Sequence, residues 1–130
     1  MGLAFERVCL SHLKQIKQKL GISGILTEVN SWYCKAEPDK GIIGSQIDLL
    51  IVRKDQVINL CEMKYSTSEY TVTEKTPQSL NRKISDFCKL TSTKYAVFPT
   101  LLTTYGVVDN SYSDYFQSVI TLNDLFEADF

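Results

Sequence analysis

Residues 46–53, which read QIDLLIVR, and residues 56–65, which read QVINLCEMKY, are two apolar segments that flank the polar residues 54–56, KDQ. Two runs of strand-forming residues on either side of a short polar turn predict a β-hairpin. If the loop has three residues, Arg53 pairs with Val57, and each step away from the turn pairs the next residue of both strands. This hairpin is the centre of the predicted sheet, and its register determines which polar side chains meet.

Four polar residues share one face of the predicted hairpin. The register places Asp48 opposite Glu62 and Gln46 opposite Lys64, and residues two apart on a strand point to the same face. Two carboxylates opposite each other repel and destabilise a sheet unless something compensates. A divalent cation does so, because hard cations such as Mg²⁺ prefer oxygen ligands. The spacing therefore predicts a Mg²⁺ or Mn²⁺ site at Asp48 and Glu62, provided that the turn has an odd number of residues.

Asp48 and Glu62 also have a simpler interpretation, as solvated residues on an exposed sheet face. Glu62-Met63-Lys64 is the only acidic-x-Lys triplet in the chain, but such a triplet alone is weak evidence. The other residues expected on the same face are all apolar: Leu50, Val52, Ile58 and Leu60. An apolar face disfavours the solvated interpretation and favours a functional cluster of Asp48, Glu62 and Lys64.

The apolar residues between Phe5 and Leu20 recur with the helical period, which predicts one amphipathic helix that ends at Gly21. Glu6 is a polar exception on the apolar stripe. A carboxylate buried there would point to the sheet, and without a partner it would cost several kcal/mol. A metal-bound water or Lys64 is its natural partner. Alternatively, Glu6 lies on the surface, favoured by the positive end of the helix.

Three more strands are predicted from their β-forming residues: Ile25–Cys34, Tyr95–Leu102 and Val119–Leu122. The helical period returns over Thr76–Thr91, with Thr76 as N-cap and Pro77 at the first helical position. The residues of this helix expected to face inward are Leu80, Ile84, Phe87 and Cys88. Asn123 or Asp124 is expected to cap a final helical turn. The order of elements predicts a single α/β domain over residues 1–130, with a mixed central β-sheet flanked by helices.

The composition of the 130 residues, with 44% hydrophobic residues and a net charge of −1, is typical of a soluble globular domain. Lysines and acids interrupt the N-terminal segment, which argues against a secretory signal and favours a cytoplasmic protein. The low charge argues against strong nucleic-acid binding unless a local basic patch or another polypeptide supplies it. The four cysteines form no CxxC or CxxH pair, so buried reduced thiols are expected rather than a zinc site. His12 is expected to be packed.

The segments 44–51 and 58–64 resemble the D…ExK core of the PD-(D/E)xK nuclease superfamily. More narrowly, the chain resembles the nuclease-like domain at the C-terminus of many predicted bacterial AAA-type ATPases. The resemblance extends over most of the chain, from residues 2–6, GLAFE, through Trp32 to residues 125–126, LF. It implies a restriction endonuclease-like fold and a domain that belongs to a longer, ATPase-containing protein.

The resemblance also implies metal-dependent phosphodiester hydrolysis of nucleic acid, with DNA as the expected substrate. Asp48 and Glu62 would hold Mg²⁺ or Mn²⁺, Lys64 would orient water or stabilise charge, and Gln46 would position water or a phosphate oxygen. Glu6 falls on the acid that often occurs in the first helix. The two residues Arg82 and Lys83 are either phosphate contacts or part of a solvated helix face. The alternative function is a catalytically inactive module of the same fold that binds nucleic acid or protein.

Overall fold

The computed structural model describes residues 2–126 as a five-stranded mixed sheet with helices on both faces. The strands are β1 (Thr27–Cys34), β2 (Ser45–Arg53), β3 (Val57–Lys64), β4 (Ala96–Thr103) and β5 (Ser118–Thr121), in that spatial order. The helices are α1 (Gly2–Leu10), α2 (Leu13–Lys19), α3 (Lys75–Thr91) and α4 (Leu122–Leu125), with 3-10 turns at Pro38–Lys40 and Ser113–Tyr115. The expected mixed α/β architecture is therefore confirmed. None of the described helices is long and apolar enough to cross a membrane.

The predicted hairpin and its register are confirmed. Strands β2 and β3 are antiparallel, with Leu49 paired to Cys61 and Val52 paired to Ile58. The N–H of Gln56 donates to the carbonyl oxygen of Arg53 at 3.2 Å, and Gln56 has a φ of 68°. A type I turn followed by a left-handed residue is a common three-residue hairpin loop, so the odd-length turn places the strands in the expected register.

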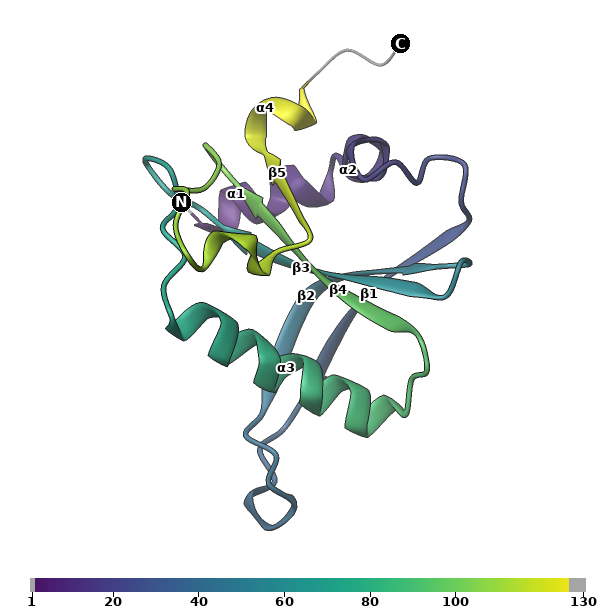
Figure 1. The fold of residues 1–130 in the computed structure, drawn as a ribbon. Coiled ribbons are helices and arrows are strands. Elements are labelled where there is room, and N and C mark those ends of the chain that lie inside the picture. The colour runs from purple at the N-terminus through teal and green to yellow at the C-terminus, as the bar shows by residue number, and fades with distance from the viewer. Residues whose placement is uncertain (1, 127–130) are drawn as a thin grey trace.

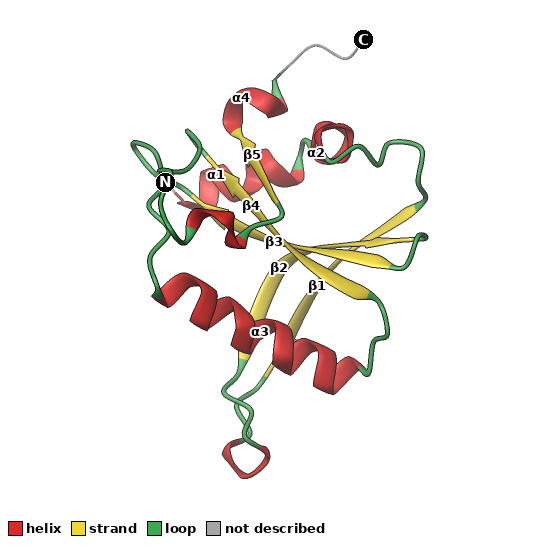
Figure 2. Cartoon of the chain, viewed as in Figure 1, coloured by secondary structure: helices red, strands yellow, loops and turns green. Residues whose placement is uncertain are grey.

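Helices cover the sheet in two layers (Figures 1 and 2). On one face, α1, α2 and α4 bury a core that includes Phe5, Ile16 and Leu125. On the other face, α3 connects β3 to the parallel strand β4 and buries Leu80 and Phe87. A parallel pair needs such a crossover, because its strands run in the same direction. The sheet is thus apolar on both faces where helices lie over it.

The first helix is broken, contrary to the single helix predicted up to Leu20. Helix α1 ends at Leu10 and α2 begins at Leu13, with His12 at φ −124° and ψ 37°. The ring Nδ1 of His12 lies 2.7 Å from the carbonyl oxygen of Val8, so this polar side chain occupies an acceptor that the helix would otherwise use. The break turns α2 so that Ile16 still reaches the core. Gly21, at a φ of 74°, ends the helix as predicted.

The remaining elements differ from prediction mainly at their ends. Helix α3 begins at Lys75 with Glu74 as N-cap, so the expected N-cap at Thr76 is wrong. Its predicted inward face is confirmed, since Leu80 and Phe87 are buried and Ile84 and Cys88 pack beside them. The last helix is capped by Thr121, whose backbone N–H donates to the carboxylate of Asp124 at 2.9 Å. Asp124 therefore contributes to the cap from inside the helix, as the acidic partner of a capping box.

Candidate functional site

The candidate site lies at the open end of the β2–β3 hairpin, opposite the turn. The last rung of this ladder joins Leu49 to Cys61, and Asp48 and Glu62 are the next residues beyond it. On its other side, β2 pairs with β1, and there the register shifts: Asn30 lies opposite Leu50, but Trp32 lies opposite Ile47. Strand β2 thus carries one extra residue where Asp48 lies, which is a β-bulge. Bulges of this kind redirect side chains and are frequent beside functional sites.

The bulge determines the direction of Asp48. Ser45 and Ile47 face α3, because Ser45 contacts Asp86 and Ile47 belongs to the core beneath α3. Gln46 alternates to the other face, and its Nε2 donates a hydrogen bond of 2.8 Å to Oδ1 of Asp48. Both side chains are exposed. Asp48 therefore lies with Gln46, on the face away from α3.

Glu62 lies on the α3 face. Its Oε1 accepts a hydrogen bond of 2.8 Å from Nζ of Lys83, a residue of α3, and its Oε2 lies 3.9 Å from Nζ of Lys64. The Glu62 side chain is only 14% exposed, so the Lys83 contact compensates a largely desolvated carboxylate. Its neighbours Cys61 and Met63 face the core under α1 instead. Strand alternation thus separates Glu62 from that core.

The expectation that the side chains of Asp48 and Glu62 share one face of the hairpin is therefore wrong. The hairpin register alone would put the two side chains on one face, but the bulge redirects Asp48 and the alternation of β3 points Glu62 toward α3. Within residues 2–126, no three His, Cys, Asp or Glu side chains gather as metal ligands. The donors nevertheless suit a hard cation, since Mg²⁺ is often held by one or two carboxylates with water and substrate phosphates. Sharing a cation would require Asp48 to leave Gln46 and Glu62 to leave Lys83.

Glu6 is half-buried on α1. Its neighbour Phe5 is buried, and Arg7 on its other side is exposed. Within the described residues, its carboxylate has no ion-pair partner within 4 Å, so the expected contact with Lys64 is not formed. Burial, with a smaller contribution from the negative charge of Glu6, raises the pKa of the Cys9 thiol to about 12. Glu6 thus lies beside the apolar core of α1 and apart from the Glu62–Lys64 pair.

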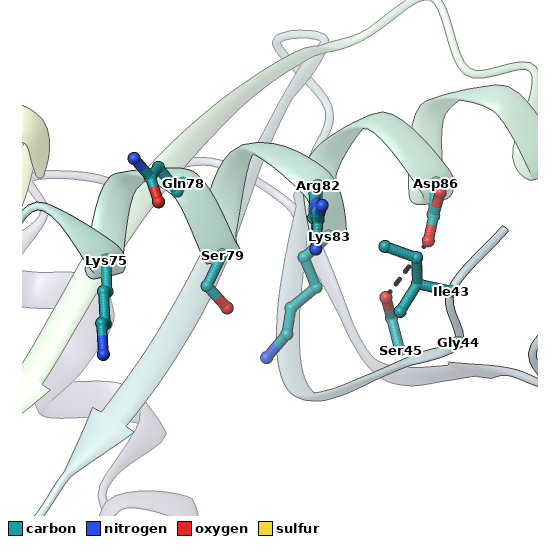
Figure 3. A pocket seen from close by; sticks show the side chains of 9 residues that line it. All are labelled: Ile43, Gly44, Ser45, Lys75, Gln78, Ser79, Arg82, Lys83 and Asp86. Carbon is teal, nitrogen blue, oxygen red and sulfur yellow. Dashed lines mark hydrogen bonds between the residues drawn. The ribbon is translucent and has the colours of Figure 1, made fainter. Parts of the chain in front are cut away.

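A groove with several cationic residues lies along α3 (Figure 3). One of its lining residues, Lys83, contacts Glu62. It encloses about 550 Å³ between the segment 43–45 and the first three turns of α3. The α3 residues that line it are Lys75, Gln78, Ser79, Arg82, Lys83 and Asp86. We call this cavity the basic groove. A second cavity of about 100 Å³ contains Glu62 and Lys64 and shares Ser79 and Lys83 with the basic groove.

The sequence had drawn attention to Arg82 and Lys83 but not to the groove. Lys75 precedes Lys83 by eight residues, and Ser79 lies between them, so the three follow the i, i+4, i+8 row of one helix face. That spacing could have indicated a basic face. The opposite wall could not be foreseen, because it comes from the segment before β2 and meets α3 only in the folded chain.

All four cysteines are free, as expected. Cys9 and Cys61 are buried in the core under α1, and burial also raises the pKa of the Cys61 thiol, so neither is a reactive thiolate at neutral pH. Cys34 and Cys88 are only partly buried, whereas buried thiols were expected. The cysteines therefore contribute to packing.

No protein-family model matches the chain, and no curated protein and no solved structure matches it either.

Proposed function

We propose that this chain is a nuclease domain of the PD-(D/E)xK type, with a restriction endonuclease-like fold, that hydrolyses phosphodiester bonds of nucleic acid with Mg²⁺ or Mn²⁺. The observation that carries the proposal is the hairpin register, which makes Asp48 and Glu62 the first residues beyond the last β2–β3 rung. The lysines beside Glu62 add nearby positive charge, which a phosphodiesterase site uses to stabilise the negative charge that develops on the phosphate.

The roles of the residues follow from these positions. Asp48 and Glu62 would hold the cation, which supplies a Lewis acid and lowers the pKa of coordinated water. Lys64, whose Nζ lies 3.9 Å from Glu62, would stabilise the negative charge that develops on the phosphate. Asp48 would exchange its hydrogen bond of 2.8 Å from Gln46 for the cation, and the released amide of Gln46 would position water or a phosphate oxygen. Glu6 would act only as an acid at the edge of the site, since it lies beside the α1 core.

A second candidate function is binding of nucleic acid or protein without cleavage. The specific observation in its favour is that each carboxylate already has a partner on a different side of the sheet: Gln46 for Asp48 and Lys83 for Glu62. If these contacts persist when nucleic acid binds, Glu62 serves to hold Lys83 in place and no cation is shared. Where the ligand is nucleic acid, the two candidates differ only in the chemistry at Glu62.

The decisive experiment is a metal-dependent cleavage assay. Supercoiled plasmid, single-stranded DNA and single-stranded RNA are incubated with the wild type and with Glu62→Gln, in Mg²⁺, in Mn²⁺ and in EDTA. The nuclease proposal expects cleavage only with metal, and a loss of about 100-fold or more in Glu62→Gln. Glu28→Gln, an exposed carboxylate on β1, is the matched control and should cleave like the wild type. Binding without cleavage in either metal would support the second candidate instead.

We also propose that an ATPase module in the same chain delivers the nucleic acid and that the protein acts in the cytoplasm. The support is the resemblance of residues 44–51 and 58–64 to ATPase-associated nuclease domains, together with a net charge of only −1. A domain of low net charge gains little from non-specific attraction to phosphates. Linkage to a module that binds nucleic acid would raise the effective concentration of nucleic acid near the domain. Comparing cleavage by the domain alone and by the domain joined to its ATPase tests this.

A further inference from the structure

The basic groove concentrates positive charge in a protein whose overall charge is −1. Lys75 and Arg82 are exposed, and within residues 2–126 neither has an acidic partner within 4 Å. The acid that lines the groove, Asp86, is only 8% exposed and accepts a hydrogen bond of 3.5 Å from the hydroxyl of Ser45. Lys83 is directed to Glu62. Two cations thus remain available to a ligand in the groove.

The cations are arranged along the groove rather than around one point. Lys75 and Lys83 are eight residues apart on α3, which corresponds to about 12 Å along the helix axis. In Figure 3, the side chains of Lys75, Ser79 and Lys83 extend from the same side of α3. Arg82 follows Gln78 by four residues on an adjacent row. The uncharged donors Gln78 and Ser79 lie between the cations, and such side chains commonly contact phosphate and sugar oxygens.

The groove also leads to the candidate catalytic end of the hairpin. Lys83 and Ser79 line both the groove and the smaller cavity that contains Glu62 and Lys64. The smaller cavity also contacts Thr76 and Leu80, so it lies beside the first turns of α3, and a ligand in the basic groove would lie alongside Glu62. An extended polyanion matches this series of contacts, whereas a single small anion would use only one part of it.

We propose that the basic groove binds the phosphodiester backbone of one strand of nucleic acid, with Lys75 and Arg82 as its phosphate contacts. The proposal deepens the function above and rests on it for the substrate class, but it does not depend on cleavage. We expect contacts from these two residues to phosphates to be insensitive to base sequence, because the attraction between a cation and a phosphate does not depend on the base. The groove thus supplies local positive charge, although the net charge of the chain is −1.

The test measures binding in EDTA, so that no cleavage can contribute. A fluorescent single strand of about 20 nucleotides is titrated with residues 1–130 in anisotropy experiments between about 50 and 200 mM NaCl. We expect the wild type to bind with a Kd of about 10⁻⁴ to 10⁻⁶ M near physiological salt. Lys75→Ala/Arg82→Ala should bind about tenfold more weakly at the lowest salt. Its slope of log affinity against log salt should fall by about 1.4, or about 0.7 for each lost phosphate contact.

Matched variants separate the groove from general charge effects. Lys54→Ala/Lys94→Ala removes two exposed lysines at the opposite end of the sheet and should leave affinity and salt slope unchanged. Lys75→Arg/Arg82→Lys keeps the charges and should retain most of the affinity. Melting curves establish that each variant is folded, and the charge-reversed Lys75→Glu/Arg82→Glu gives a larger loss if the alanine effect is small.

Three outcomes would overturn the proposal. The first is wild-type affinity and salt slope in both Lys75→Ala/Arg82→Ala and Lys75→Glu/Arg82→Glu. The second is an equal loss in Lys54→Ala/Lys94→Ala, which would show that net charge alone matters. The third is displacement of the strand by pyrophosphate as effectively as by unlabelled strand at equal phosphate concentration, which would indicate a small-anion site. Failure of the nuclease proposal would appear elsewhere, as intact binding without metal-dependent cleavage.

Discussion

The two ends of the β2–β3 hairpin differ in how their polar side chains are satisfied. At the turn end, the guanidinium of Arg53 donates to Asp55 at 2.6 and 3.0 Å and to Asn59 at 3.1 Å, and Asn59 donates to Thr100 at 3.1 Å. Arg53, Asn59 and Thr100 lie on the paired strands β2, β3 and β4, and Asp55 lies in the turn between β2 and β3. Asn59 is 2% exposed, so this network closes a buried part of the sheet.

At the open end, the ladder stops and the polar side chains turn to partners outside it. Asp48 bonds to Gln46 on a bulge, while Glu62 and Lys64 lie beside the α3 face next to the basic groove. Polar residues of one hairpin therefore differ in role: those that the rest of the chain buries stabilise the fold, and those left open to solvent are available to bind ligands. Substitutions at the turn end should therefore change stability alone, whereas substitutions at the open end should also change the response to ligands.

The largest effect is expected from Asn59→Ala. It removes a buried amide that bridges Arg53 and Thr100, and the partners left behind cannot all reach water. We expect a loss of about 2–3 kcal/mol in the free energy of unfolding, measured by urea denaturation. Nucleic-acid binding by the folded protein should be unchanged. Asn30→Ala, at an exposed position on β1, is the control and should cost less than about 0.5 kcal/mol.

The next largest effect is expected from Lys83→Met, which keeps the length of the side chain but removes its charge. Glu62 is 14% exposed and would keep only the contact of 3.9 Å to Lys64. We expect a destabilisation of about 2 kcal/mol, because the closest partner of a largely buried carboxylate is lost. The double variant with Glu62→Gln should recover part of it, and the coupling free energy of this mutant cycle gives the strength of the pair. Strictly additive effects would show that the pair contributes nothing.

A divalent cation should sharpen the contrast between the two ends. At about ten times its Kd, Mg²⁺ or Mn²⁺ bound to the folded state stabilises it by about 1.4 kcal/mol. Melting curves should show this gain in the wild type and a larger one in Lys83→Met, where Glu62 is released from its lysine. Asp48→Asn should lose the gain, whereas Asp55→Asn at the turn should keep it. Equal melting temperatures with and without metal in the wild type and in Lys83→Met would argue against a cation site.

The smallest effect is expected from the pH dependence of the turn. The hydrogen bond from Arg53 lowers the pKa of the Asp55 carboxyl from its usual 3.8. Because this pKa is lower in the folded state than in the unfolded state, the contact stabilises the protein above the unfolded pKa. The contribution is lost as the pH falls through the lower, folded value. The melting temperatures of the wild type and Asp55→Asn should therefore differ slightly at neutral pH and converge in acid. A difference that persists at the lowest pH would contradict this origin.

Sequence patterns alone predict the β2–β3 hairpin and the inward face of α3. The apolar runs and the polar residues 54–56 specified the hairpin and its odd-length turn, because turn length fixes which residues pair. The helical period specified α3 and its inward face at Leu80 and Phe87, since side chains three and four residues apart lie on one side of a helix. Candidate residues Asp48, Glu62 and Lys64 were also placed correctly along their strands, at the end remote from the turn.

The directions of the Asp48, Glu62 and Lys64 side chains depend on how the strands and helices pack together. The bulge at Asp48 arises from the pairing of β2 with β1, and alternation on β3 turns Glu62 toward α3 while Cys61 packs under α1. The basic groove has the same origin, because residues 43–45 and α3 are distant in the chain. The break at His12 has a local cause, since its side chain competes for the carbonyl oxygen of Val8. Local periodicity carries no information about such contacts. A shift of one residue in pairing is enough to move a carboxylate to the other face of a sheet.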